Sequence, residues 1–595
     1  MARDGLRIGG ACGFWGESPH ATAQLLRDPG LNVLVYDYLA EITLSIMARA
    51  RAKDAAQGFA GDFVTGAMAP NLREIARRGI RVLSNAGGMN PAACAEALRA
   101  EIGRQGLGLR VAVVEGEDLL GQIARVAEAP EMFSGAPFPP RERVLSVNAY
   151  LGAWPVAAAL GAGADIVITG RCADSALTLA ACLDAFGWGA DQFDLLAAGS
   201  LAGHLLECGP QATGGNFTDW DSVPELARVG YPIAEMRADG RFGIEMPPET
   251  GGLVTRETVG EQMLYEIGDP GAYLLPDVTC DFTGVTLEQA APGRVDVSGA
   301  RGRAPNGSLK VSTTSLAGYR AGQVLNFNGR GAREKGIAYA EAAVARARAR
   351  LGAQGAQDFD AVQIESFGGR PGPGDFEEVA VTAAVRHAEP GPVGIFLKEL
   401  IGGALGTPPG LHFFTGAGRP KPSPVVALHS SLVPADLPEV TVTLAGAEVP
   451  FEQPDVPGGA QTPAPQVPEA VDPAGRDMVQ VPLETLAVAR SGDKGDTANI
   501  GVMARLPTYL PWIWAALTPE AVARVFDREA EGPITRYALP GTSAMNIVMT
   551  RALGGGGIAS LRNDSQGKGF AQRLLAQPVA IPAELVPNRE RGARA

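Results

Sequence analysis

Short apolar segments alternate with helical ones at the start of the chain, and this alternation constrains the fold more than any other feature. The strand-like segments start at Leu6 and Asn32 and recur at 80–84, 111–115 and 164–170. The helical segments lie at 38–47, 71–78 and 91–104. Apolar strands separated by helices predict an α/β fold with a mostly parallel sheet that helices flank.

In such sheets ligands bind beyond the carboxyl ends of the strands, where the connecting loops lie. One of these loops carries Asn85, Gly87 and Gly88, whose backbone and side-chain amides could hold an oxyanion. We therefore predict these three as substrate-binding residues. The glycine-rich loop 9–16 lacks the GxGxxG pattern, so a dinucleotide site is not expected there.

A second loop of this kind follows the strand at 164–170. Arg171 supplies a permanent cation and Asp174 a carboxylate, which we predict to bind substrate and to act as an acid/base group. Asp174 could instead cap the helix that begins at Ala176. Lys310, in a basic turn that leads into a predicted strand at 309–312, is predicted to bind an anionic group, although such turns are often only solvated.

The stretch from Gly203 to Trp220 is unusually rich in acid/base groups. It opens as a helical turn that places His204, Glu207 and Cys208 at positions i, i+3 and i+4, on one face. We predict all three as catalytic residues. The alternative is a hydrogen-bonded core histidine beside a cysteine that packs as a small apolar residue.

The same stretch then stops being helical at a Gly-Pro pair. Gly214, Gly215 and Asn216 follow as a loop of small residues, which would let backbone amides approach a ligand closely. We predict these three as substrate-binding residues. A zinc ion would need a third and a fourth ligand besides the histidine and the thiol, and none is visible nearby, so no metal site is expected.

Composition limits the partners of the chain. The net charge of −14 at pH 7 repels a phosphate backbone, so nucleic acid is not an expected partner. No window holds about 18 uninterrupted apolar residues, so we expect no membrane span. The six cysteines show no CxxC pair, and the N-terminus shows no signal peptide, which together favour the cytoplasm.

The chain, at 595 residues, is too long for one core. We expect a large α/β domain at 1–450, with a possible subdivision near 284, and a linker rich in Pro and Gly at 451–476. The remaining residues, 477–595, predict a small α+β domain. In it, strands at 479–489 and 499–504 would flank a polar loop at 490–498.

Several long motifs resemble the acyclic terpene utilisation proteins of the AtuA type. They lie at 8–16, 84–91, 164–175, 203–220, 251–255, 265–270, 490–495 and 554–557. The resemblance implies a large α/β domain followed by a ferredoxin-like domain. It also implies pathways that break down branched isoprenoids as coenzyme A thioesters, but it gives no catalytic residue to carry over.

The residues and the resemblance together favour an enzyme of branched-chain or acyclic isoprenoid catabolism. Its substrate would be an acyl-CoA or a related carboxylic compound, and a lyase, a hydratase and a hydrolase all remain open. Coenzyme A would enter as part of the substrate, and no other cofactor is expected. The alternative is a non-catalytic subunit that binds CoA esters or acts as a scaffold. We further expect a homo-oligomer.

Overall fold

The predicted strands at the start of the chain form the centre of one large sheet. The computed structural model describes residues 5–369, 376–412, 420–455 and 467–586. Five parallel strands lie in the order β4-β6-β3-β2-β1. Their bounds are Val111–Glu115, Ile166–Thr169, Arg81–Ser84, Val33–Tyr36 and Leu6–Gly10. The predicted α/β class with a parallel sheet is thus confirmed.

Antiparallel strands extend this parallel centre at both edges. Strands β7, β8, β12 and β11 continue beyond β1, and β19 and β20 continue beyond β4, to give eleven strands. Their bounds are Ile233–Met236, Phe242–Glu245, Arg294–Ser298, Thr286–Ala291, Thr441–Leu444 and Ala447–Glu448. Strands from beyond residue 284 therefore complete a sheet that begins at residue 6.

Helices cover both faces of the parallel centre. Val33 and Val35 of β2 pack into one apolar cluster with α6, α7 and α8, whereas Leu34 and Tyr36 pack into another with α1 to α4. The helices on the first face are Trp154–Gly161, Ala176–Phe186 and Phe193–Leu206. Those on the second are His20–Leu25, Glu41–Lys53, Leu72–Arg78 and Pro91–Arg104. Because neighbouring side chains of a strand point to opposite faces, a strand buried on both sides is apolar throughout.

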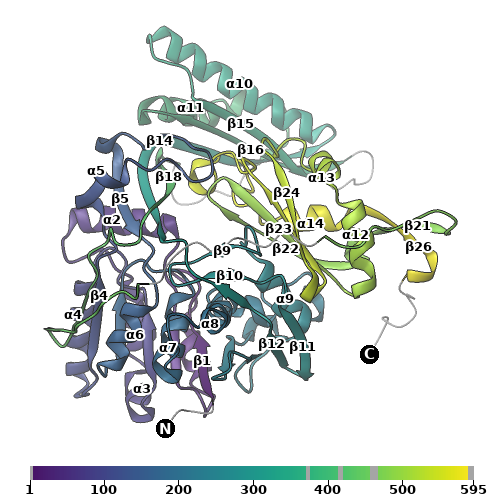
Figure 1. The fold of residues 1–595 in the computed structure, drawn as a ribbon. Helices are drawn as coiled ribbons and strands as arrows, with labels where there is room; N and C mark the ends of the chain where they lie inside the picture. Colours follow the sequence, from purple (N-terminus) through teal and green to yellow (C-terminus); the bar gives the residue numbers. More distant parts are fainter. Residues whose placement is uncertain (1–4, 370–375, 413–419, 456–466, 587–595) are drawn as a thin grey trace.

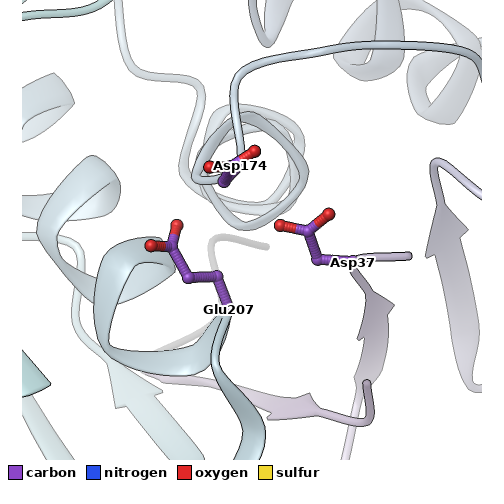
Figure 2. Close-up of side chains that lie close together, drawn as sticks. All are labelled: Asp37, Asp174 and Glu207. Carbon is purple, nitrogen blue, oxygen red and sulfur yellow. The ribbon is translucent and has the colours of Figure 1, made fainter. Parts of the chain in front are cut away.

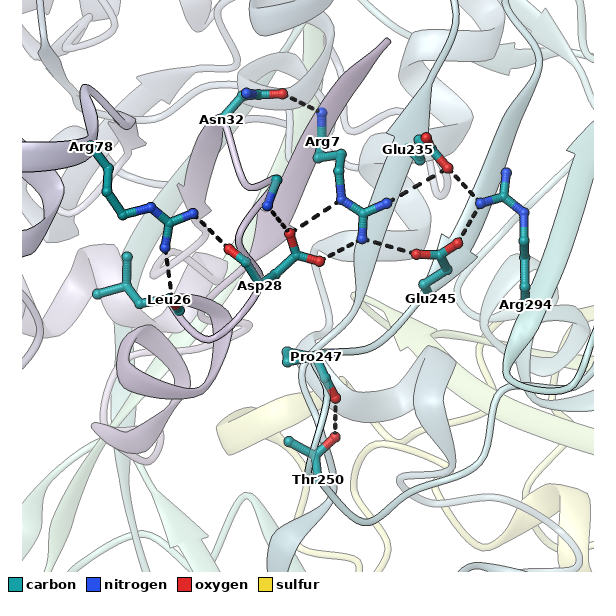
Figure 3. A network of polar contacts seen from close by, with 11 residues as sticks. Arg7, Leu26, Asp28, Asn32, Arg78, Glu235, Glu245, Pro247, Thr250 and Arg294 are labelled. Atoms are coloured by element: carbon teal, nitrogen blue, oxygen red, sulfur yellow. Dashed lines mark hydrogen bonds and ion pairs between the residues drawn. The ribbon is translucent and has the colours of Figure 1, made fainter.

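An ion-pair network joins the parallel centre to its antiparallel extension (Figure 3). Arg7 on β1 pairs with Asp28 at 2.5 Å and with Glu245 on β8 at 2.9 Å. Arg294 on β12 pairs with Glu245 and with Glu235 on β7. Two arginines thus connect four neighbouring strands.

A second sheet stands above the first and is built around one long strand (Figure 1). Strand β14 runs from Ser308 to Gly329, although the sequence predicted only a short strand at 309–312. Its first half pairs with β18 and β5, and its second half pairs with β16 and β17. The partner strands, with β15 beside β16, are Ser423–Pro434, Val144–Ala149, Glu377–His387, Leu411–His412 and Ala361–Gly368. Helices α10 (Ala332–Ala353) and α11 (Pro390–Gly402) pack on its outer face.

The C-terminal domain contains a four-stranded antiparallel sheet in the order β22-β23-β25-β24. These strands are Ala487–Lys494, Thr497–Ala504, Ala544–Met549 and Ile534–Leu539. One face packs on α12, α13 and α14, which are Leu510–Ala516, Pro519–Val525 and Phe570–Leu575. A further pair, β21 (Met478–Pro482) and β26 (Pro578–Pro582), lies beside them.

Two predictions for this domain were wrong. The predicted polar loop 490–498 consists mostly of the facing ends of β22 and β23, which a tight turn joins. The predicted strand 479–489 is divided between β21 and β22. Polar side chains in β22 hid its strand character, because they face another part of the protein.

The predicted linker at 451–476 falls partly outside the described residues, which omit 456–466. Its described parts contain no helix or strand. Among the described residues, none of the helices combines the length and the apolar character needed to cross a membrane.

Candidate active site

A cavity lies where the two domains meet, at the carboxyl edge of the parallel strands. Its volume is about 380 Å³. Its charged and acid/base lining groups are Asp174, His204, Glu207, Glu266, Asp269, Lys310, Asp493 and Lys494. Its apolar wall includes Met132, Phe133, Leu274, Leu275, Pro276 and Leu432. Charged and apolar side chains therefore line the same cavity.

His204 and Glu207 form a hydrogen-bonded pair in this cavity. His204 lies in the last turn of α8, and Nδ1 of its ring lies 3.0 Å from Oε1 of Glu207. Nε2 lies 3.2 Å from the carbonyl oxygen of Met263. A carbonyl oxygen only accepts, so Nε2 carries a proton, and Nδ1 is left to exchange a proton with Glu207.

Burial and mutual attraction compete in setting the pKa of each partner. Burial disfavours the imidazolium of His204, but the carboxylate of Glu207 outweighs burial and raises the histidine pKa. Burial also raises the pKa of Glu207, and His204 only partly offsets this effect. The pair therefore retains a proton to higher pH than either free side chain would.

Asp174 is held by a buried arginine. Nη1 of Arg171 lies 2.8 Å from Oδ1 of Asp174 and donates to the carbonyl oxygen of Leu39 at 2.6 Å. The guanidinium of Arg171 also stacks over the ring of Tyr150, with 4.0 Å to the ring centroid. The capping role considered for Asp174 is not observed, since α7 begins with Ser175 at its N-cap and without a side-chain hydrogen bond.

Asp174 is one of three carboxylates that lie close together (Figure 2). One oxygen each of Asp37, Asp174 and Glu207 lie within 4.8 Å of one another. Burial and the charge of Asp174 raise the pKa of Asp37, while Arg171 opposes the shift. A proton on Asp37 and the guanidinium of Arg171 can therefore reduce the negative charge of this cluster of three carboxyl groups.

The sequence predicted no metal site, but this carboxylate cluster could hold one. Carboxylate oxygens are the ligands that hard cations such as Mg²⁺ and Ca²⁺ prefer. The cluster combines Asp37, Asp174 and Glu207, whereas Cys208 is not among its members. Soft-ligand zinc chemistry therefore does not fit these donors.

Four of the predicted site residues line the cavity together: Asp174, His204, Glu207 and Lys310. Nζ of Lys310 lies 4.7 Å from the centroid of the Tyr150 ring, on which Arg171 also stacks. Arg171 itself is buried behind the wall, where it orients Asp174. These residues come from the loop after β6, the end of α8 and strand β14, which lie apart in the sequence.

The thiol of Cys208 is not part of the cavity lining. Burial and the neighbouring carboxylate of Glu207 raise its pKa well above the usual range. The thiol therefore keeps its proton near neutral pH, and a protonated thiol is a poor nucleophile.

The loop after β3 supports the site without lining the cavity. The amide of Asn85 donates to Oδ1 of Asp37 at 2.6 Å. A Cβ on Gly87 would lie 2.6 Å from the carbonyl oxygen of Thr169, and one on Gly88 would meet Sδ of Met47 at 2.2 Å. The two glycines thus allow this loop to pack closely against its neighbours.

The loop of Gly214, Gly215 and Asn216 lies at the contact between the domains. Nη1 of Arg490, from the C-terminal domain, donates to the carbonyl oxygens of Gly215 at 3.3 Å and Asn216 at 3.0 Å. Asn216 adopts φ of 54°, in the left-handed region, and is exposed. Asn216 therefore lies at a contact between the domains and does not line the cavity.

Sequence reasoning missed Asp37 of the carboxylate cluster and several residues that line the cavity. Asp37 stands at the end of β2, and its place after an apolar strand was a signal for it. Lys494 lies within the motif 490–495 but was assigned to a loop. Glu266 lies in the motif 265–270, just after α9 (Arg256–Leu264), but was not singled out, and Tyr273 lies in the two-residue strand β9 (Tyr273–Leu274).

Comparison with known families agrees with this architecture. The model of the acyclic terpene utilisation family protein AtuA matches residues 6–444. The model of the AtuA ferredoxin-like domain matches residues 481–580. No curated protein and no solved structure matches the chain. Since the first model alone covers more than half of the sequence, the chain belongs to the AtuA family of acyclic terpene utilisation, with a C-terminal ferredoxin-like domain.

Proposed function

We propose that the protein is an enzyme of branched-chain or acyclic isoprenoid catabolism that acts on an acyl-CoA or a related carboxylic substrate. The observation that carries this proposal is the convergence of Asp174, His204 and Glu207 with Lys310 in one cavity. A cavity of about 380 Å³ has the size of a small-ligand site.

The apolar and the charged lining residues suit the two parts of such a substrate. The apolar wall, with Phe133, Leu274 and Leu432, can bury a branched hydrocarbon chain. The carboxylates that line the same cavity would meet the carbon and oxygen atoms near the thioester. Lys310 would meet an acidic group of the substrate, whereas the nucleotide part of coenzyme A would extend outside the cavity.

Glu207 is the acid/base group that the geometry favours most. Its side chain is 11% exposed, whereas that of His204 is 2% exposed, so the carboxylate is the more accessible partner of the pair. We infer that His204 is a positioning residue, because both ring nitrogens are engaged and it acts through Glu207. Asp174 is the second acid/base group, and Arg171 orients it.

The proposal is tested by incubating the purified chain with branched acyl-CoA thioesters and following their masses. Calorimetric titration with the same thioesters measures binding separately from turnover. We expect at least one thioester to bind and to change mass. Binding without any mass change would favour the alternative, a non-catalytic subunit that binds CoA esters. A panel of acyl-CoAs that neither bind nor react would contradict both.

A further inference from the structure

The ferredoxin-like domain forms one wall of the cavity. Asp493, Lys494, Thr497, Asn499, Tyr537, Val548 and Thr550 line it from this domain. Strand pairing places Lys494 opposite Thr497, and Asn499 opposite Val548, so these side chains share one face of the four-stranded sheet. The other face, with Ile500 among its residues, packs on the domain's own helices. The domain therefore uses its polar face to close the cavity.

The segment that follows α9 lies across this polar face and is held by two buried asparagines. The amide of Asn499 donates to the carbonyl oxygen of Leu264 at 2.8 Å, and its Oδ1 accepts from the backbone of Glu266 at 2.9 Å. The amide of Asn546 donates to the carbonyl oxygens of Ile267 and Gly268, both at 2.6 Å. Side-chain amides thus bind this segment much as a neighbouring strand would.

Two glycines of the domain make this contact possible. A Cβ on Gly492 would lie 2.5 Å from Cγ of Glu266, and one on Gly501 would lie 2.3 Å from Cβ of Leu264. Real Cβ atoms do not approach other carbons so closely, so larger residues would force the domains apart. These two glycines of the ferredoxin-like domain therefore allow the close contact between the domains.

A charged network at this contact fixes Lys494. Its Nζ lies 2.9 Å from Oε2 of Glu266, whose Oε1 lies 3.1 Å from Nζ of Lys568. Nζ of Lys568 also lies 3.0 Å from Oδ1 of Asp493. The ammonium of Lys494 also acts on the His204–Glu207 pair, since its charge opposes the rise in the pKa of Glu207.

We propose that Lys494 is a substrate-contacting residue that binds the thioester carbonyl oxygen as negative charge develops on it. Lyases, hydratases and hydrolases of acyl-CoA thioesters all pass through a species with negative charge on this oxygen, so the role holds for each. A cation that is already fixed where negative charge develops stabilises that charge without having to reorganise. Glu266 and Lys568 are positioning residues. This inference rests on the proposed function.

The inference assigns the ferredoxin-like domain a place in the active site. If the domain only docked partners, turnover would stay unchanged when Lys494 lost its charge. A domain that completes the site makes turnover depend on that charge, while folding depends on it less, because the side chain of Lys494 is 32% exposed.

The test measures kcat of the wild-type chain and of the variants Lys494→Met and Lys494→Arg. The control variant is Lys398→Met, because Lys398 is exposed on α11. Loss of one oxyanion-stabilising group typically costs about 100-fold or more in kcat. We expect such a loss in Lys494→Met, partial recovery in Lys494→Arg and no change in Lys398→Met. Melting temperatures show whether each variant is folded.

Two further measurements separate this inference from the proposed function. The pH dependence of kcat/KM in Lys494→Met should move to higher pH, because the neighbouring cation no longer opposes protonation of Glu207. A folded Lys494→Met with kcat within about twofold of wild type would overturn the inference alone. If wild type binds acyl-CoA without turnover, unchanged affinity in Lys494→Met overturns it, whereas weaker binding supports the contact. A wild type that neither binds nor converts any acyl-CoA overturns both.

Discussion

Nδ1 of His204 lies 3.0 Å from Oε1 of Glu207, one helical turn further along the chain, while Nε2 of the same ring lies 3.2 Å from the carbonyl oxygen of Met263. The imidazole is therefore fixed on both sides. This arrangement makes the histidine a partner that sets the protonation of Glu207, and it leaves the carboxylate to act on a ligand.

Replacing His204 with Ala is expected to lower kcat/KM by about 100-fold or more while the chain stays folded. Without the imidazolium, burial raises the pKa of Glu207 further, so less of the carboxylate is ionised at neutral pH. The pH dependence of kcat/KM should therefore move to higher pH. The control is His20→Ala, since His20 is exposed at the start of α1. Turnover equal to wild type at every pH would exclude the proposed role of His204.

Replacing Cys208 with Ala is expected to leave kcat/KM within about twofold of wild type, because a thiol that keeps its proton is a poor nucleophile. Iodoacetamide should likewise leave turnover unchanged at pH 7, since burial raises the pKa of this thiol. Mass spectrometry of the treated chain shows whether Cys208 was modified. Loss of turnover in Cys208→Ala with an unchanged melting temperature would return the thiol to the catalytic residues.

Asn216→Gly separates a structural role of this loop from a role in binding substrate. Glycine adopts the left-handed backbone of Asn216 without cost, and the carbonyl that accepts from Arg490 is kept. We expect KM within about twofold of wild type and an unchanged melting temperature. A rise in KM alone would show that the side-chain amide binds substrate after all.

The domain contact is expected to weaken in acid through Glu266. Burial opposes ionisation of this carboxyl, but the ammonium groups of Lys494 and Lys568 outweigh burial and lower its pKa to about 2, from an ordinary value of 4.5. Because the pKa of Glu266 is lower in the folded chain, its ionised carboxylate contributes to the free energy of unfolding above pH 4.5. This contribution is lost as the pH falls from 4.5 towards 2.

Melting temperatures of wild type and Glu266→Gln, taken from pH 7 down to pH 3, measure this contribution. The difference between them should be largest at neutral pH and should shrink below pH 4.5. Glu96→Gln, on the exposed side of α4, serves as the matched control and should show no such trend. A difference that stays constant across the range would contradict the assigned pKa.

The sequence allowed the centre of the fold to be predicted for a clear physical reason. Strands buried on both faces, such as β2 and β6, are apolar along their whole length, and the helices between them show regular spacing. The antiparallel edges could not be predicted in this way, because they pair strands from distant parts of the chain. Strand β14 was underestimated, since its polar run from Ser312 to Ser315 is buried between two partner strands.

The candidate site was predictable only where its residues share a local motif. Asp174 follows a buried strand, and His204 and Glu207 lie on one helical face, so sequence spacing identified them. Lys494 and Glu266 come together through docking of the two domains, which no local pattern encodes. A homo-oligomeric state and a cytoplasmic location stay predictions, for sedimentation and cell fractionation to test.

The central claim is that the carboxylate of Glu207 acts on a substrate held in the cavity between the domains. The most direct measurement incubates branched acyl-CoA thioesters in deuterated water with wild type, Glu207→Gln or Glu96→Gln, and records their mass spectra. We predict a product or incorporated deuterium with wild type and with Glu96→Gln. With Glu207→Gln, the rate should fall by about 100-fold or more. Equal rates with Glu207→Gln and wild type, or thioesters that bind wild type and are recovered unchanged, would contradict the claim.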